Sequence, residues 1–153
     1  MDLYIANEQE TLAVGIRLAH AVHHGATIFL SGNTGAGKST LVRGILQGLG
    51  LRLPKSNSRS SYLQSYNAHG LIIHYFDLSS LNDPTDQRFV EAANRLDEAS
   101  TVRIVESPEH AHGNLTEPDL HIKFRQGLKG RTLLIESINK HGSMLVHAIN
   151  AHH

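Results

Sequence analysis

Residues 32–39 have the composition and spacing of a phosphate-binding loop. They read Gly-Asn-Thr-Gly-Ala-Gly-Lys-Ser and satisfy the pattern G-x-x-x-x-G-K-[ST] in full. The glycines let the backbone curl so that several N–H groups point into one hollow the size of an anion. In such a loop the lysine reaches the β- and γ-phosphates of a nucleoside triphosphate, and the final hydroxyl binds Mg²⁺. The pattern therefore predicts these nucleotide contacts, with Lys38 also catalytic and Ser39 also on the metal: Gly32, Asn33, Thr34, Gly35, Ala36, Gly37, Lys38 and Ser39.

Two carboxylates follow apolar runs elsewhere in the chain. Asp77 ends the run 71–76, and Glu106 ends the run 101–105. In open α/β sheets ligands bind beyond the carboxyl ends of the strands, so we expect both acids beside the loop as catalytic and metal-binding groups. One would hold Mg²⁺ with its water shell, and the other would orient or deprotonate an attacking water. Their residue types leave the two roles unassigned, and the alternative is a pair of exposed strand-end acids.

The elements that must position these groups can be predicted from hydrophobic periodicity. Helical spacing predicts a helix from about residue 8 to residue 23, with Asn7 as its N-cap, and a second helix that opens at Lys38. Short apolar runs predict buried strands at 26–30, 71–76 and 101–105. Residues 82–84 form a turn before a further helix, and 107–118 are expected as a loop.

The C-terminal part of the chain has a different pattern. Apolar and polar residues alternate over 120–125, which predicts a half-exposed antiparallel strand. Residues 126–130 are the turn, 131–138 the partner strand, and a helix is expected around 143–150. Together the elements predict a single α/β domain over residues 1–153, with a mixed sheet and a C-terminal antiparallel hairpin.

Composition excludes several classes of function. The 14 basic and 14 acidic side chains balance, which argues against a protein that mainly coats nucleic acid or an anionic membrane. The chain has no cysteine, so thiol and Cys-ligated metal chemistry are excluded. With no long apolar run and no signal-peptide pattern at residue 1, we expect a cytoplasmic protein without a membrane segment.

Charge is nevertheless segregated along the chain. Residues 77–119 carry ten acids and three arginines, and we interpret this segment as a solvated face, with a docking site for a partner or a metal–phosphate group as the alternative. Residues 54–61 are serine-rich and basic without an apolar anchor, and we expect them to be mobile. The twelve histidines show no spacing typical of a metal site.

The sequence resembles the TsaE family, also called YjeE, along nearly its whole length. The resemblance rests on the loop itself and on segments far more specific than a phosphate loop. These are Thr11-Leu12, Gly32 to Thr40, Arg43-Gly-Ile-Leu-Gln-Gly-Leu-Gly50, His74-Tyr-Phe-Asp-Leu78, Leu81 with Asp83-Pro84, Val105-Glu106 with Pro108, and Gly130-Arg131.

The resemblance implies a fold and a function. TsaE proteins are single three-layer P-loop NTPase-like domains that bind ATP and Mg²⁺ and hydrolyse ATP weakly alone. They support the TsaD–TsaB pair in forming N6-threonylcarbamoyladenosine at position 37 of tRNA, so the expected partners are TsaD and TsaB, with tRNA involved indirectly and no DNA. By position, the resemblance adds Thr11, Thr40, Gly130 and Arg131 to the nucleotide contacts.

The sequence departs from the family pattern in three places. Asn33-Thr34 replaces an Asp-Leu pair, and Ser39 replaces a threonine but keeps the hydroxyl. The family's switch segment is nearly unrecognisable in 58–65, where a hydroxyl survives if Ser60 stands at the threonine position, although Arg59 replaces the preceding proline. Ser107 replaces a tryptophan after Glu106. We expect these changes to leave ATP binding intact, and they leave the hydrolysis rate and the partner interface open. The altered switch therefore keeps an ATP-dependent assembly factor that has lost hydrolysis as one alternative. A small P-loop metabolite kinase is a separate alternative.

Overall fold

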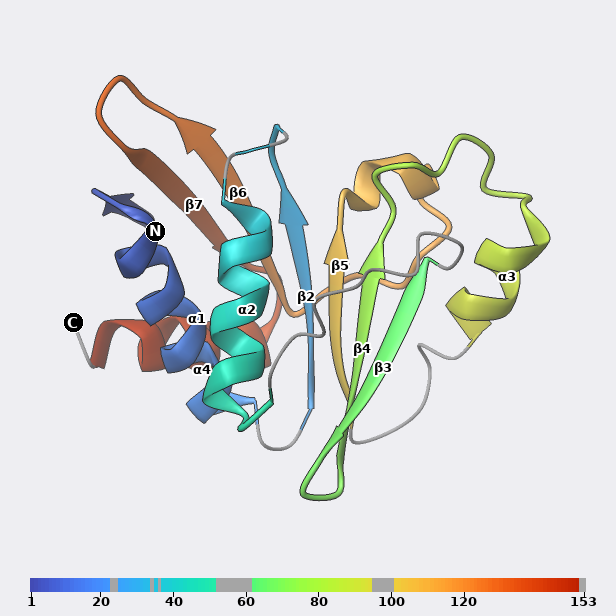
Figure 1. Ribbon diagram of the computed structural model, residues 1–153, viewed down its shortest axis with the longest axis horizontal. Helices are drawn as coiled ribbons and strands as arrows, with labels where there is room; N and C mark the ends of the chain where they lie inside the picture. Colours follow the sequence, from blue (N-terminus) through green and yellow to red (C-terminus); the bar gives the residue numbers. More distant parts are fainter. Residues whose placement is uncertain (23–24, 34, 36, 52–61, 95–100, 152–153) are drawn as a thin grey trace.

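A seven-stranded mixed sheet organises the computed structural model, which describes residues 1–22, 25–33, 35, 37–51, 62–94 and 101–151 (Figure 1). The strand order is β1-β7-β6-β2-β5-β4-β3. The four inner strands are parallel: β6 (Leu120–Gln126), β2 (Ala26–Ser31), β5 (Thr101–Glu106) and β4 (Leu71–Asp77). Antiparallel partners flank them: β7 (Arg131–Ser137), β1 (Asp2–Ile5) and β3 (Leu63–Ala68).

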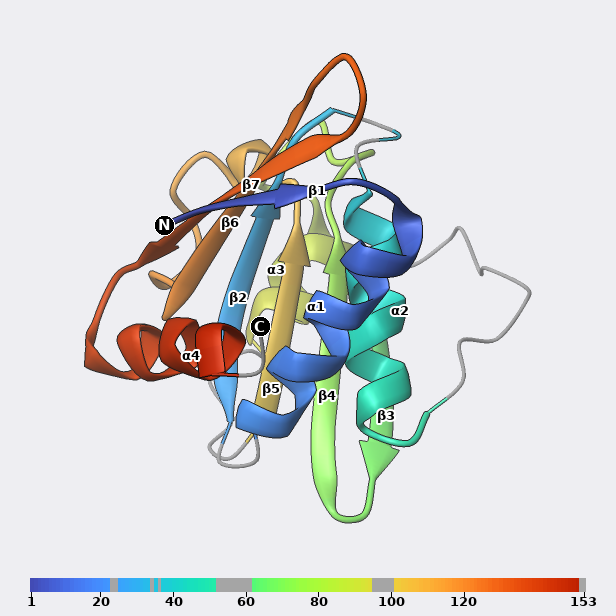
Figure 2. The ribbon, with the colours of Figure 1, turned by 90° about the vertical axis from the view of Figure 1, so that its left-hand side faces the viewer.

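Helices cover both faces of this sheet. α1 (Glu8–Ala21), α2 (Lys38–Gly48) and α4 (Lys140–Ala151) lie on one face. α3 (Gln87–Asn94) and the short 3-10 helix η2 (Pro108–Ala111) lie on the other (Figure 2). The three-layer α/β class and the C-terminal hairpin expected from the sequence are therefore confirmed. In the part of the chain that is described, no helix is long and apolar enough to cross a membrane.

Alternation along β5 divides the hydrophobic core in two. Ile104 faces the larger cluster under α1, α2 and α4, whereas Val105 faces the smaller cluster with Phe76 and Phe89 of the α3 side. Both side chains are fully buried, as a central parallel strand requires. β5 is therefore held by packing on both faces, which also fixes the position of its last residue, Glu106.

The start of α1 follows the sequence prediction closely. Asn7 is the N-cap, and its side chain accepts a hydrogen bond of 2.9 Å from the backbone N–H of Glu10. The Glu10 carboxylate in turn accepts from the N–H of Ala6 at 2.8 Å. Reciprocal bonds of this kind satisfy N–H groups that a helix start leaves free.

Three glycines let α1 and α2 approach each other at backbone distance. A Cβ added to Gly44 would lie 2.3 Å from the carbonyl oxygen of Leu12 and 3.1 Å from the Cα of Gly15. One added to Gly15 would lie 2.5 Å from the carbonyl oxygen of Leu41. A Cβ added to Gly48 would lie 2.5 Å from the Cβ of Ala19 and 3.1 Å from the carbonyl oxygen of Ile16. We call Gly15, Gly44 and Gly48 the glycine seam; it holds the helix that follows the phosphate loop directly against α1.

The sequence prediction missed both edge strands and one short helix. β1 has only four residues, and β3 reads Leu-Gln-Ser-Tyr-Asn-Ala, so neither contains the apolar run of a buried strand. Backbone pairing of β1 with β7 and of β3 with β4 places them instead. The expected loop 107–118 contains η2, and the C-terminal helix begins at Lys140, earlier than expected.

Candidate nucleotide-binding site

The predicted loop lies between the parallel strand β2 and the helix α2, as its pattern requires. Gly32, Gly35 and Gly37 have φ angles of +143°, +83° and +109°, which side chains other than glycine rarely adopt. At Gly32 a Cβ would also lie 2.9 Å from the Cβ of Phe124. The loop backbone is therefore open to an anion, and the first turn of α2 directs free N–H groups and the positive end of its dipole toward it.

The Lys38 ammonium lies where the loop meets the end of β5. It donates to the carbonyl oxygen of Gly32 at 2.5 Å and to the Ser107 hydroxyl at 3.4 Å. Ser39 is exposed in the same first turn. A cation and a hydroxyl thus accompany the loop, as phosphate and Mg²⁺ binding require.

Ser107 belongs to this site, although the sequence marked it only as a departure from a family pattern. It is 4 % exposed and has φ +58° and ψ +51°, a left-handed conformation. Its N–H donates to the carbonyl oxygen of Leu30 at 2.8 Å. Backbone strain of this kind costs about 1–3 kcal/mol and is typical of functional sites. No sequence signal would have revealed the conformation.

Asp77 and Glu106 end neighbouring parallel strands and lie directly opposite each other in the β4–β5 register. The Asp77 side chain is exposed and accepts from the backbone N–H of Ser79 at 3.0 Å. Glu106 is only 5 % exposed. The adjacency of the two acids thus matches the sequence prediction, while their environments differ strongly.

Only one of the two Glu106 carboxylate oxygens accepts a hydrogen bond from a described residue. The Tyr75 hydroxyl donates to its Oε2 at 2.6 Å. The buried Oε1 has no hydrogen-bond partner among the residues that the structure describes. Burial raises the pKa of Glu106, helped by the charge of Asp77 and opposed by the Tyr75 hydrogen bond and Lys38. Burial and the Glu106 charge raise the pKa of Tyr75 far above its usual value, so the phenol remains a donor.

A cavity of about 490 Å³ opens beside the loop. One wall is the chain from Ile5 to Glu8, and the opposite wall is the hairpin turn from Gln126 to Arg131. Arg131 donates to the carbonyl oxygen of Gly35 at 2.9 Å and so connects the hairpin to the loop. Figure 2 shows the hairpin of β6 and β7 rising above the loop that follows β2. The sequence pattern predicted the hairpin turn and the start of α1 as elements, but periodicity did not indicate that they face each other across a cavity beside the loop.

The other candidate residues differ in whether the structure places them at the cavity. Gly130 and Thr40 line the cavity, and the Thr40 hydroxyl donates to Glu8 at 3.2 Å. Asn33 is exposed on the loop. Thr11 is fully buried in α1 and does not line the cavity. Thr34, Ala36 and the segment 54–61 with Ser60 lie outside the described residues.

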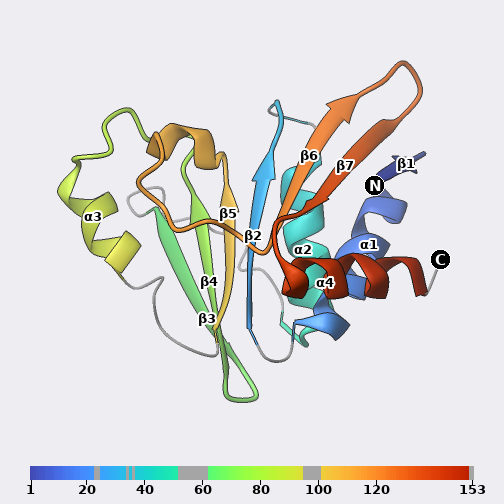
Figure 3. The ribbon, with the colours of Figure 1, turned by 180° about the vertical axis from the view of Figure 1, so that it is seen from behind.

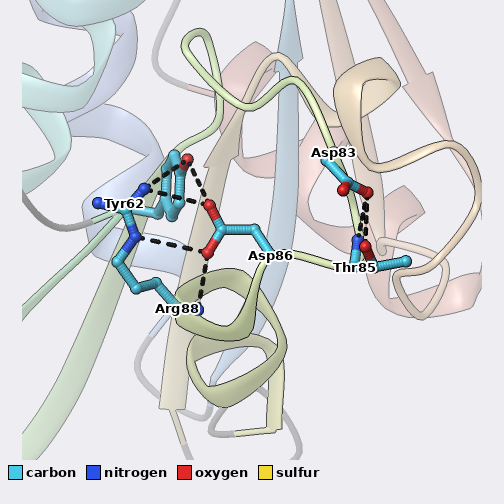
Figure 4. A network of polar contacts seen from close by, with 5 residues as sticks. All are labelled: Tyr62, Asp83, Thr85, Asp86 and Arg88. Carbon is cyan, nitrogen blue, oxygen red and sulfur yellow. Dashed lines mark hydrogen bonds and ion pairs between the residues drawn. The ribbon is translucent and has the colours of Figure 1, made fainter.

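Two acids of the segment 77–119 are satisfied by neighbours in their own stretch of chain (Figure 4). Asp83 accepts from the N–H and the hydroxyl of Thr85, at 2.9 and 2.7 Å, which lowers its pKa. Asp86 accepts from Arg88 at 3.1 Å, and this contact lowers the Asp86 pKa. The Arg88 guanidinium lies 5.2 Å from the centre of the Tyr62 ring. These contacts fit a solvated face better than a second anion or metal site.

The donor set fits Mg²⁺ rather than a transition metal. Within the described ranges, no three His, Cys, Asp or Glu side chains form a metal-binding group. Mg²⁺ needs only one or two protein oxygens when phosphates and waters supply the others, and Ser39, Asp77 and Glu106 offer such oxygens. The buried Oε1 of Glu106, which has no hydrogen-bond partner within the described ranges, is consistent with this.

A phosphate loop between a central parallel strand and a helix, with carboxylates at the ends of the adjoining strands, defines the P-loop NTPase class. A sequence model of the family described as "Threonylcarbamoyl adenosine biosynthesis protein TsaE" matches residues 5–133. The chain belongs to this TsaE family.

Individual relatives agree with the family match. A protein of Haemophilus influenzae is 31% identical over 126 residues, 79% of each chain, and is named tRNA threonylcarbamoyladenosine biosynthesis protein TsaE. A Nostoc protein with the same name is 32% identical over 79 residues, 52% of this chain and 49% of its own. The crystal structure of Bacillus subtilis YdiB superposes with a TM-score of 0.76 at 23% identity, covering 99% of this chain and 95% of its own, which shows a shared fold.

Proposed function

We propose that this chain is an ATP-binding, weakly ATP-hydrolysing subunit that supports the formation of N6-threonylcarbamoyladenosine at position 37 of tRNA. Membership of the TsaE family and the names of the relatives support the pathway. The observation that carries the nucleotide role is the junction of the loop with β5, where Lys38 lies between the Gly32 carbonyl and Ser107, the residue that follows Glu106.

Each candidate residue has a defined task in this proposal. The glycine loop and the α2 N-terminus bind the phosphates, Lys38 neutralises the β- and γ-phosphates, and Ser39 holds Mg²⁺. Asp77 and Glu106 hold the metal's water shell and orient the attacking water. Mg²⁺ supplies charge neutralisation at the phosphates. The cavity between the N-terminal wall and the hairpin is the place for the base and ribose.

The proposed protein partners are TsaD and TsaB, which transfer the threonylcarbamoyl group. A protein with balanced charge has little electrostatic attraction for nucleic acid, so we propose that tRNA is reached through these partners. We also propose that the whole chain acts as a single domain, and in the cytoplasm.

Two measurements test the function. ATP affinity is measured by titration with Mg²⁺, and the chain is then co-purified with TsaD and TsaB with and without ATP. We expect micromolar or tighter ATP binding and ATP-dependent retention of both partners. Absence of ATP binding by the folded protein would contradict the nucleotide role, whereas ATP binding without retention would contradict only the partner assignment.

Ser107 supports a second candidate, an ATP-dependent assembly factor that has lost hydrolysis. Ser107 replaces the family's tryptophan and contacts Lys38 directly. Phosphate release in the presence of TsaD and TsaB separates the two candidates. Release above the background of a Lys38→Ala protein supports the ATPase; release equal to that background supports the assembly factor.

A further inference from the structure

Tyr75 is the only described residue that forms a hydrogen bond to the Glu106 carboxylate, and although it lies in the family-like segment 74–78, the sequence gave its hydroxyl no role. It lies on β4, two residues before Asp77, and is paired with Ile104 of β5. Its hydroxyl therefore crosses from one parallel strand to the end of the next, at the edge of the sheet where the phosphate loop lies.

This contact decides which carboxylate oxygen is available. A carboxylate can rotate about its last bond unless something fixes it, and Glu106 is nearly fully buried with only one bonded oxygen. The 2.6 Å bond from Tyr75 engages Oε2 and leaves Oε1 without a hydrogen-bond partner among the described residues. A buried polar atom without a partner is costly, so an oxygen left in this state is typical of a site completed by a ligand or an ordered water.

We propose that Tyr75 is a positioning residue: its hydroxyl fixes the Glu106 carboxylate by Oε2 so that Oε1 faces the Mg²⁺–ATP site. This inference rests on the proposed nucleotide function. Tyr75 touches neither nucleotide nor metal in this role and acts entirely through Glu106. A structural alternative is that the phenol only fills space between β4 and β5.

The test compares Tyr75→Phe with Tyr66→Phe. Both substitutions remove one phenolic hydroxyl from neighbouring strands, but the Tyr66 hydroxyl donates to Gln64 at 2.7 Å and does not reach Glu106. The ring of Tyr75 remains in the Phe variant, so packing is kept. Thermal unfolding of each variant confirms the fold before nucleotide is added.

Two readouts are measured in parallel. A hydrogen bond to a charged group is worth about 10- to 100-fold when one partner is removed. For Tyr75→Phe we expect kcat to fall about tenfold or more while the KM for ATP changes less than about twofold. Independently of hydrolysis, the Mg²⁺ concentration that gives half-maximal ATP binding should rise several-fold. Tyr66→Phe should change neither quantity.

Both substitutions are then repeated in a Glu106→Gln background. In this background the Tyr75 hydroxyl can position only an uncharged amide, so Tyr75→Phe should add less than about a twofold effect there. An effect of equal size in both backgrounds, or no effect in either readout, overturns the inference in favour of a space-filling role. If the parent protein itself binds no ATP, the proposed nucleotide function is contradicted as well. The ATP titration of the parent protein distinguishes this outcome from a failure of the Tyr75 inference alone.

Discussion

Lys38 places a partly buried ammonium group beside the phosphate loop, and its substitution tests the role of the loop directly. Lys38→Ala removes a charge-assisted contact worth about 1.5–3 kcal/mol, so ATP affinity should fall about 10- to 100-fold. Isothermal titration of the folded variant measures this. Lys140→Ala, an exposed lysine on α4, is the control and should bind ATP like the parent. Equal affinity in Lys38→Ala would remove the phosphate-binding assignment.

Glu106 tests chemistry separately from binding. Glu106→Gln keeps the size and one acceptor but loses the negative charge and the basic oxygen. We expect ATP binding to persist and steady-state hydrolysis to fall by about 10²–10⁴-fold. Glu117→Gln, an exposed carboxylate in the loop after η2, should hydrolyse at the parent rate. Hydrolysis at the parent rate in Glu106→Gln would reduce Glu106 to a buried strand-end acid.

His121 predicts a pH dependence of stability. Its Nε2 lies 2.7 Å from the Ser31 hydroxyl, and burial with the charge of Lys123 lowers its pKa, against a smaller opposite effect of Glu136 and Glu109. The unfolded chain therefore binds this proton more readily than the folded one. Stability contributed by neutral His121 is complete above about pH 6.5 and is lost as the pH falls below it.

Chemical denaturation at pH 7.5 and pH 5.5 measures this effect. His121→Gln, which can still bond to Ser31, should lose less of its free energy of unfolding over this interval than the parent does. His147→Gln, an exposed histidine on α4, should follow the parent. A His121→Gln protein with the parent's pH dependence would contradict the prediction.

Some residues of the site could be predicted from the sequence, and others could not. The loop and the two acids were predictable because a complete motif and two strand ends leave the chain little choice of place. The roles of Tyr75 and Ser107 were not predictable from the sequence. A tyrosine within a strand, or a serine just after one, gives no sign of which residue its hydroxyl will contact. Arg131 was indicated only by family resemblance, since its bond to Gly35 spans 96 positions.

At the scale of elements, the glycine seam makes α1 and α2 one unit. Gly44→Ala would gain up to about 1 kcal/mol of helix propensity but would place a methyl group 2.3 Å from the Leu12 carbonyl oxygen. Overpacking of this kind costs about 1–3 kcal/mol, and here the neighbour is backbone and cannot rotate away. We therefore expect a net loss of stability, despite the better helix former.

Thermal unfolding checks this, with Gln47→Ala on the exposed face of α2 as the control. Gly44→Ala should lower the Tm by several degrees, while Gln47→Ala should leave it within about a degree. A Tm for Gly44→Ala at or above that of the parent would show that the two helices can separate without cost.

Elements were predictable where burial gives them a pattern. The inner strands and the two helices around the loop have apolar runs or helical spacing, and the hairpin alternates. β1 and β3 do not, because each edge strand is fixed by backbone hydrogen bonds to its neighbour. For β1 this neighbour is β7, far along the chain, and for β3 it is the next strand, β4. Tertiary pairing, rather than local preference, decides such strands.

For the whole molecule, the sheet order predicts a gradient of local stability. β2 and β5 are flanked on both sides by parallel neighbours and packed on both faces, whereas β1 and β3 are edges (Figure 3). Amide hydrogen exchange should be slowest in β2 and β5 and fastest in β1 and β3. Protection of β1 equal to that of β2 would mean that the cavity wall is as rigid as the core.

The pairing of β1 with β7 has a consequence for the order of synthesis. One wall of the cavity, from Ile5 to Glu8, leaves the ribosome well before the facing wall, from Gln126 to Arg131. A nascent chain that already contains the phosphate loop still lacks a closed cavity. Nucleotide stabilises only the form that it binds, so it cannot help the early chain and acts only once the hairpin has been made.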